Sequence, residues 1–271
     1  MMRLLDGPMG TELGRRGVSL ASAEWSARAL ADAPEVVAAI HADYAAAGAT
    51  VHTATTFRTR RLHLGSAWEE QARFAVTLAR RALPEHHQLA GSIAPLSDCY
   101  RPDLSPADTA AHGELPRVLA AAGCDLLLCE TFPHAGEAAA AVRHSVRTGL
   151  PTWVAFTAGP RGHLLDPETM SEAAREAVGA GASAVLVNCT PARDTRRFLE
   201  AIARAKLGVE IGAYANAAVA ANIDGVEATS DPGPSEYARL ALGWRDAGAT
   251  IIGGCCGTTP AHVAALAQAL G

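Results

Sequence analysis

Lysine is almost missing from this chain. The 271 residues include 23 basic side chains, and Lys206 is the one lysine among them. Chemistry that needs a Schiff-base lysine is therefore nearly excluded. The chain also has no G-x-x-x-x-G-K-[ST] segment, so it contains no phosphate-binding loop of that type.

Three further shortages concern partners and location. Acidic residues outnumber basic ones by 28 to 23, so no basic footprint for nucleic acid is expected. No run of about 18 apolar residues occurs, which predicts no membrane span. Asp6 and Gly7 come too early to leave room for the apolar core of a signal peptide. We therefore expect a cytoplasmic protein, in which disulfides are disfavoured.

Eight short apolar runs alternate with longer, alanine-rich segments of helical spacing. Several runs, such as LLLCE and AVLVNC, are continuously apolar, as in parallel strands buried on both faces. The predicted strands are 4–6, 50–56, 89–94, 125–130, 152–156, 184–189, 209–214 and 250–254. The predicted helices are 34–47, 68–83, 114–122, 134–147, 167–179, 194–205, 235–247 and 260–270.

Eight βα units in a chain of this length predict the α/β class, as a single (βα)8 TIM barrel domain over residues 1–271. Gly48, Gly123, Gly181 and Gly248 each precede a predicted strand, where glycine supplies the left-handed end of a helix. An open doubly wound sheet is the structural alternative. It is disfavoured because no G-x-G-x-x-G follows the first strand.

In such a barrel the active groups come from the carboxyl ends of the strands. Two acids and three of the six cysteines fall at these ends. The residues there that bear on chemistry are Asp6, Gly7, Glu130, Asn188, Cys189, Cys255 and Cys256. Tyr214 and Asn216, near the end of the seventh strand, could serve simply as the rim of the pocket.

Cys189, Cys255 and Cys256 together predict a zinc site. Three thiolates can hold Zn²⁺ and leave a fourth tetrahedral position open, which is typical of catalytic rather than structural sites. The adjacent pair can face one metal only if the backbone turns between them, and the flanking glycines permit that turn. Cys189 would have to reach across the barrel mouth, which a ring of about eight strands allows.

Other interpretations of these residue types stay open. A buried cysteine is often a small apolar core residue, and this is the preferred interpretation for Cys124 and Cys129. Cys99, in a loop after the third strand, is expected to be incidental. Asp6 could cap a turn, because Asp-Gly is a common turn pair, and Glu130 could pair with an arginine.

Histidines do not add an obvious catalytic group. His134 and His262 each lie near the start of a predicted helix, and we expect surface or capping roles for them. None of the strand ends discussed above carries a histidine.

At these residues the sequence resembles the homocysteine S-methyltransferase family, over nearly the whole chain. The similar segments are DGPMGTEL at 6–13, AGSI at 90–93, ETF at 130–132, VNCT at 187–190 and GGCCGTTPAH at 253–262. The glycine-flanked cysteine pair, combined with the upstream Asn-Cys-Thr and the opening Asp-Gly, is highly specific.

The resemblance implies a (βα)8 barrel with Zn²⁺ on the three cysteines, and a thiol acceptor, usually homocysteine, at the remaining metal position. By the same analogy Asp6 and Glu130 bind the amino group of that acceptor, Gly7 offers backbone, and Asn188 belongs to the same pocket wall. The chemistry has a physical reason. The thiolate is the nucleophile, and coordination to zinc deprotonates a thiol.

The methyl donor is less defined. The chain ends about one helix after the cysteine pair, which favours a free-standing enzyme using S-methylmethionine or S-adenosylmethionine. The loops after the fifth and seventh strands, at 158–167 and 214–219, depart from the family pattern and are expected to choose the donor.

Two alternatives remain. One keeps the zinc-thiolate chemistry with another thiol or a selenol as acceptor, or with a separate methyl-corrinoid protein as donor. The other is a non-catalytic barrel that binds zinc or an amino acid. The partners expected are a small thiol amino acid and a methyl donor, and the sequence does not indicate an oligomeric state.

Overall fold

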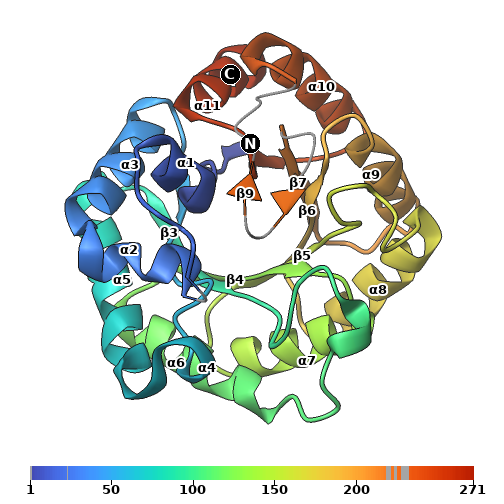
Figure 1. The fold of residues 1–271 in the computed structure, drawn as a ribbon. Coiled ribbons are helices and arrows are strands. Elements are labelled where there is room, and N and C mark those ends of the chain that lie inside the picture. Colours follow the sequence, from blue (N-terminus) through green and yellow to red (C-terminus); the bar gives the residue numbers. More distant parts are fainter. Residues whose placement is uncertain (1, 23, 218–220, 223–224, 227–231) are drawn as a thin grey trace.

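A closed ring of eight parallel strands forms the centre of the molecule (Figure 1). The computed structural model describes residues 2–22, 24–217, 221–222, 225–226 and 232–271. The ring strands are β1 (Arg3–Leu4), β2 (Val51–Thr53), β3 (Gln88–Ile93), β4 (Leu126–Phe132), β5 (Thr152–Phe156), β6 (Ala184–Pro191), β7 (Glu210–Asn216) and β10 (Ile251–Gly254). They run in the order β1-β10-β7-β6-β5-β4-β3-β2, and a parallel bridge between Leu5 and Val51 joins the two ends.

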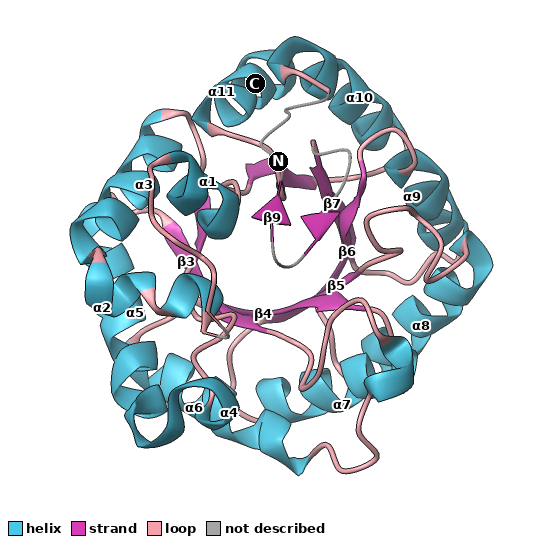
Figure 2. Cartoon of the chain, in the orientation of Figure 1, coloured by secondary structure: helices cyan, strands magenta, loops and turns pink. Residues whose placement is uncertain are grey.

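Helices surround this ring on the outside (Figure 2). Eight of them connect successive strands or close the chain, close to the predicted ranges: α3 (Pro34–Ala46), α5 (Trp68–Ala82), α6 (Glu114–Ala122), α7 (Ala135–Val146), α8 (Pro167–Gly179), α9 (Thr195–Arg204), α10 (Pro234–Asp246) and α11 (Pro260–Leu270). The predicted (βα)8 barrel is therefore confirmed. The four glycines expected before strands all have positive φ, from 100° at Gly123 to 110° at Gly181.

Short elements that the sequence did not predict lie in the loops above the carboxyl ends of the strands. They are α1 (Met9–Arg15), α2 (Ala29–Asp32), α4 (Arg61–Leu64), four 3₁₀ turns and the antiparallel pair of β8 (Ala221–Asn222) and β9 (Gly225–Val226). The last two residues of the loop segment 214–219 lie outside the described residues. These additions fold over the barrel mouth, where loops of this architecture carry function.

The apolar core has two layers, because successive strand residues point to opposite sides of the sheet. Leu127 and Cys129 of β4 face the helices, whereas Leu126 and Leu128 fill the barrel interior. The interior layer also includes Cys189, Tyr214 and Cys255, at its upper end. Cys124 and Cys129 are buried in the outer layer, as predicted. No helix in the described part of the chain is long and apolar enough to span a membrane.

Candidate active site

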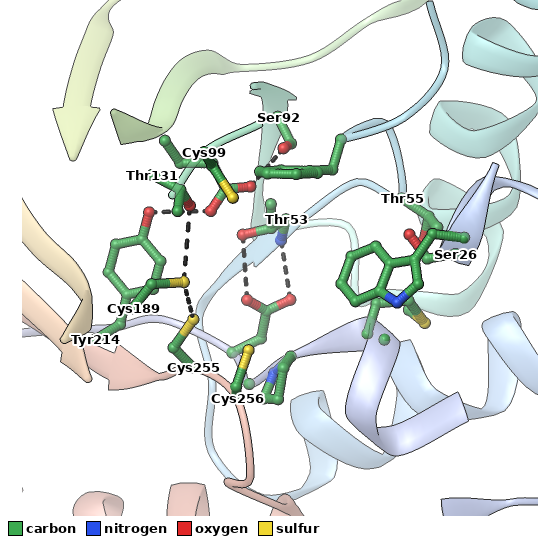
Figure 3. Close-up of a pocket in the computed structure, with 18 of the residues that line it drawn as sticks. Ser26, Thr53, Thr55, Ser92, Cys99, Thr131, Cys189, Tyr214, Cys255 and Cys256 are labelled. Atoms are coloured by element: carbon green, nitrogen blue, oxygen red, sulfur yellow. Dashed lines mark hydrogen bonds between the residues drawn. The ribbon is translucent and has the colours of Figure 1, made fainter. Parts of the chain in front are cut away.

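A pocket of about 140 Å³ lies at the carboxyl ends of the barrel strands (Figure 3). It gathers six of the seven residues singled out from the sequence: Asp6, Gly7, Glu130, Cys189, Cys255 and Cys256. Asn188 is fully buried and is absent from the lining. Residues separated by up to 250 positions in the chain thus share one cavity, because parallel strands bring their carboxyl ends to one face.

The three cysteine sulfurs converge in this pocket. Cys189 Sγ lies 2.9 Å from Cys255 Sγ, and all three sulfurs lie within 4.8 Å of one another. The backbone turns after β10, where Thr258 N–H donates to the Cys255 carbonyl and Gly257 has φ of 83°. This is the turn that the flanking glycines predicted.

Cys189 reaches the cluster through an irregular stretch of β6. Its φ is 47°, a left-handed conformation that costs a non-glycine residue about 1–2 kcal/mol. The β6–β7 register shifts between Asn188 and Pro191, which turns the Cys189 side chain into the barrel. Thr131 in β4 is left-handed too, with φ of 65°, beside a register shift of its own.

Asn188 connects these two strained positions. Its amide nitrogen donates to Thr131 Oγ1 at 2.8 Å, and its amide oxygen accepts from Thr131 N–H at 3.2 Å. Thr131 Oγ1 in turn lies 3.7 Å from Cys189 Sγ. The structure therefore places Asn188 behind the pocket, where it holds β4 against β6. Its predicted place in the substrate-binding wall stays a prediction.

The three cysteine thiols shift one another's pKa values. The neighbouring sulfurs of Cys189 and Cys256 raise the pKa of Cys255 well above its usual value, and burial adds to the rise. Hydrogen bonds from the other two thiols lower the pKa of Cys256 well below its usual value. The three sulfurs therefore disfavour the thiolate form of Cys255 and favour that of Cys256.

The donor set fits a zinc ion. Thiolate is a preferred zinc ligand, and two thiolates on one tetrahedral zinc lie about 3.8 Å apart, given a Zn–S bond of roughly 2.3 Å. The observed separations, from 2.9 Å to at most 4.8 Å, bracket this value. A divalent cation would stabilise the ionised form of all three cysteines.

Two buried carboxyl groups face the same pocket. Asp6 Oδ2 accepts from Thr53 N–H at 2.9 Å, and Asp6 Oδ1 accepts from the Thr53 hydroxyl at 3.2 Å. Glu130 accepts from the Ser92 hydroxyl and, at 3.0 Å, from the Tyr214 hydroxyl. Among the described residues Glu130 has no arginine partner, so the open interpretation as an ion pair with arginine is wrong.

Burial changes the pKa of both acids. It raises the pKa of Asp6 to about 8 and that of Glu130 to about 7. A buried carboxylate without a cationic partner is costly, so at pH 7 Asp6 is mostly protonated and Glu130 is about half protonated. Together the acids form a receptor for a cation such as an ammonium group.

Gly7 has a steric reason to be glycine. A Cβ at this position would lie 2.5 Å from the ring of Tyr44, well inside contact distance. The backbone therefore approaches the tyrosine closely and turns from Asp6 into the pocket wall.

Several lining residues were missed by sequence reasoning. Cys99 was expected to be incidental, yet it is buried in the pocket wall, where burial raises the pKa of its thiol. Trp25, Phe57, Arg58 and Tyr100 also line the pocket. They come from loops, whose place over the barrel mouth is set by tertiary packing and carries no periodic signal in the sequence.

Two histidines have the capping roles expected of them. His134 precedes α7 and accepts from Glu137 N–H at 3.2 Å. His262 accepts from Thr259 N–H at 3.2 Å in a reciprocal cap at the start of α11.

An eight-stranded parallel barrel whose mouth holds three converging sulfurs opposite two buried acids defines a (βα)8 enzyme with a thiol-rich, metal-competent site. Comparison with known proteins is more specific. The family model described as homocysteine S-methyltransferase matches residues 3–270, so the chain belongs to the homocysteine S-methyltransferase family and is a methyltransferase.

Individual relatives agree with this assignment. The chain is 32% identical to homocysteine S-methyltransferase of Escherichia coli, over 97% of this chain and 93% of the relative. It is 28% identical to homocysteine S-methyltransferase YbgG of Bacillus subtilis, over 97% and 93%. Among solved structures, the metallated form of the homocysteine methyltransferase MmuM from E. coli matches with a TM-score of 0.82 and 28% identity. That match covers 98% of this chain and 96% of the other.

Proposed function

We propose that this enzyme transfers a methyl group from a small sulfonium donor, S-methylmethionine or S-adenosylmethionine, to the thiol of homocysteine, giving methionine. The observation that carries the proposal is the convergence of Cys189, Cys255 and Cys256 opposite the buried acids Asp6 and Glu130 in one pocket. The family to which the chain belongs supports the acceptor.

Cys189, Cys255 and Cys256 would hold a zinc ion through their sulfurs. Zinc with three protein ligands has a fourth position for the acceptor sulfur, and it favours the thiolate form that acts as nucleophile. The strained backbone at Cys189 and the turn after β10 hold the three sulfurs in place before the ion binds.

Asp6 and Glu130 would receive the ammonium group of homocysteine. Each carboxyl loses its proton when the ammonium takes the place of the missing cation, because an opposite charge favours the ionised form. Thr53, Ser92 and Tyr214 fix the carboxyl oxygens through the hydrogen bonds described above. The acceptor is thereby held with its sulfur toward the cysteines, which supplies the proximity part of catalysis.

The transfer balances without an oxidant or reductant. The sulfonium carbon–sulfur bond breaks, and its electron pair stays on the departing sulfur. A new carbon–sulfur bond forms to the acceptor, and the acceptor thiol proton is released. With S-methylmethionine, both the donor and the acceptor become methionine. Apolar residues around the pocket exclude water from the sulfonium and its methyl group.

The test is zinc content and methyl transfer in the purified protein, supplied with homocysteine and either sulfonium donor. Cys189→Ala is expected to lose stoichiometric zinc and activity together. Cys129→Ala is the matched control, because it removes a buried thiol from the outer core. If Cys189→Ala kept both zinc and methyl transfer, the mechanism would be wrong. If activity needed an added corrinoid protein, the sulfonium donor would be wrong.

A further inference from the structure

The loop after β2 carries arginines that the proposed chemistry has not used. Arg58 lines the pocket, and among the lining residues that the structure describes it is the one cationic side chain. Arg60 follows two positions later, with its backbone N–H bonded to the Arg58 carbonyl at 2.9 Å. Both belong to a chain whose formal net charge is −5, so local positive charge here is not a property of the whole surface.

Arg58 is held in place but has unused hydrogen-bond donors. Its Nη1 lies 3.0 Å from His63 Nε2, and its guanidinium carbon lies 5.7 Å from the centre of the Phe57 ring. Its Nε is buried without an acceptor. Its other terminal nitrogen, Nη2, has no hydrogen-bond partner among the described residues, so it can donate to a carboxylate that enters the pocket.

His63 is suited to orient Arg58. Burial, and then the positive charges of Arg60 and Arg58, lower the pKa of His63 to about 4. The imidazole is therefore neutral at physiological pH, and Nε2 can accept the Nη1 proton of Arg58. This contact engages Nη1 of the guanidinium and leaves Nη2 without a partner among the described residues.

Arg60 places a second cation next to Arg58, although it lines a neighbouring pocket and not this one. Its three side-chain nitrogens are all buried, and none has an acceptor among the described residues. Burial, and then the charge of Arg58, lower the pKa of Arg60 to about 10, so it stays protonated at neutral pH. The nearby carboxylate of Glu137 is already bonded to Leu96 N–H, Ser105 and His112.

This positive corner is separate from the acids. Among the described residues no hydrogen bond or ion pair joins Arg58 to Asp6 or Glu130. Arg58 also forms no ion pair within the described part of the chain. The pocket thus has an acidic, sulfur-lined side and a cationic side. Trp25 and Phe57 also lie in its wall, packed edge to face with their ring centres 6.2 Å apart.

We propose that Arg58, oriented by His63 and reinforced by Arg60, forms the subsite that binds the α-carboxylate of the methyl donor. The inference rests on the proposed function. Homocysteine uses the acids and the sulfurs, so the donor has to approach from the other side. S-methylmethionine and S-adenosylmethionine both combine a sulfonium with a free α-carboxylate. Aromatic faces such as Trp25 attract the sulfonium, and Arg58 pairs with the carboxylate.

The experiment compares S-methylmethionine with its methyl ester, which keeps the sulfonium and lacks the negative charge. In Arg58→Gln the KM for S-methylmethionine is expected to rise roughly 10- to 100-fold, the range for lost hydrogen bonds to a charged group. The KM for the ester and the KM for homocysteine are expected to stay unchanged. Arg58→Lys keeps the charge without the planar guanidinium group. Its KM for S-methylmethionine is expected to lie between those of the wild-type protein and Arg58→Gln.

Arg61→Gln is the matched control. Its side chain is 62% exposed and pairs with Glu114 outside the pocket, so no change is expected in either KM. Calorimetric binding of S-methylmethionine and of the ester to wild type and Arg58→Gln gives the same comparison without turnover. This binding measurement tests the donor subsite even if no methyl transfer occurs. Binding without transfer would contradict the proposed function but not the donor subsite.

Three results would overturn the inference. The first is equal binding of S-methylmethionine and its ester by the wild-type protein. The second is a rise in the homocysteine KM of Arg58→Gln with the donor unaffected, which would assign Arg58 to the acceptor. The third is an equal loss for acid and ester, which would make Arg58 a structural residue.

Discussion

Two groups of side chains in the described part of the barrel bring metal-ligand atoms within 4.8 Å of one another. One is Cys189, Cys255 and Cys256, and the other is Asp6, His41 and His52. The sulfurs line the pocket, whereas His41 and His52 are fully buried and do not line it. The Asp6 oxygens are already bonded to Thr53.

The difference teaches that proximity of ligand atoms does not by itself make a site. The cysteines stand at strand ends, repel one another when ionised and face open space. Burial lowers the pKa of His41 to about 4 and that of His52 to about 3, so both are neutral and need no counter-charge. His52 also has a partner, since its Nε2 lies 3.0 Å from His87 Nδ1.

The largest expected effect separates the two groups by metal content. Cys255→Ala is expected to lose the bound metal and to lower methyl transfer roughly a thousandfold, because a catalytic metal supplies several kcal/mol. His41→Leu is expected to retain the metal at the wild-type stoichiometry. Elemental analysis of both dialysed proteins checks this. Metal loss in His41→Leu with retention in Cys255→Ala would reverse the comparison.

Asp6 lies close to His41 and His52, but it also lines the pocket. Asp6→Asn therefore tests whether this carboxyl group serves metal binding or substrate binding. The homocysteine KM is expected to rise roughly 30-fold or more, the cost of truncating one partner of a buried charge pair. Metal content is expected to stay unchanged. Steady-state kinetics with parallel metal analysis checks both, and loss of metal with an unchanged KM would move Asp6 to the histidine group.

The pH dependence of binding follows from the acids. Asp6 and Glu130, with pKa values of about 8 and about 7, are protonated at low pH in the free enzyme. Because the ammonium binds to their ionised forms, the homocysteine KM is expected to fall as pH rises from 6 to 8. Kinetics at fixed donor concentration measure this, and Asp6→Asn should flatten the upper part of the profile.

The pH dependence of stability has opposite signs at Asp6 and at His41, two members of the same group. The folded-state pKa of Asp6 is raised, so the folded form holds the extra proton and stability falls as pH rises from about 4 to 8. The pKa of His41 is lowered, so stability falls as pH drops from about 6.5 to 4.

His41→Leu is expected to reduce the acid-side slope by up to about 1.4 kcal/mol per pH unit. No hydrogen bond of the His41 ring is lost, since neither ring nitrogen has a partner in the described structure. Denaturant unfolding at pH 5 and pH 7 measures the change. An unchanged slope would mean that His41 titrates normally in the folded protein.

The smallest expected effect concerns Tyr214→Phe. The tyrosine hydroxyl donates to Glu130 Oε2 at 3.0 Å, and its removal leaves Ser92 to orient the carboxyl group. The homocysteine KM is expected to rise about three- to tenfold, the range of one hydrogen bond. The donor KM should not move, and a change in the donor KM alone would place Tyr214 in the other subsite.

The fold was predictable because its signals are local. Continuous apolar runs, helical spacing between them and glycine before the strands identified all eight ring strands to within a few residues. β1 and β2 were predicted too long at their carboxyl ends, where Asp6 and Ala54 keep backbone hydrogen bonds to neighbouring strands but no longer belong to a strand. The loop elements such as α1 and α4 were missed, since their packing partners are distant in sequence.

For the site, the sequence by itself determined which residue types stand at the strand ends, and it sorted Cys124 and Cys129 from the other cysteines. Tertiary structure alone decided that Asn188 holds the left-handed Thr131 from behind, and that Arg58 lines the pocket with one terminal nitrogen against His63. The physical reason is that strand-end positions follow from periodicity, whereas hydrogen-bond partners, burial and the resulting pKa values depend on contacts between distant segments.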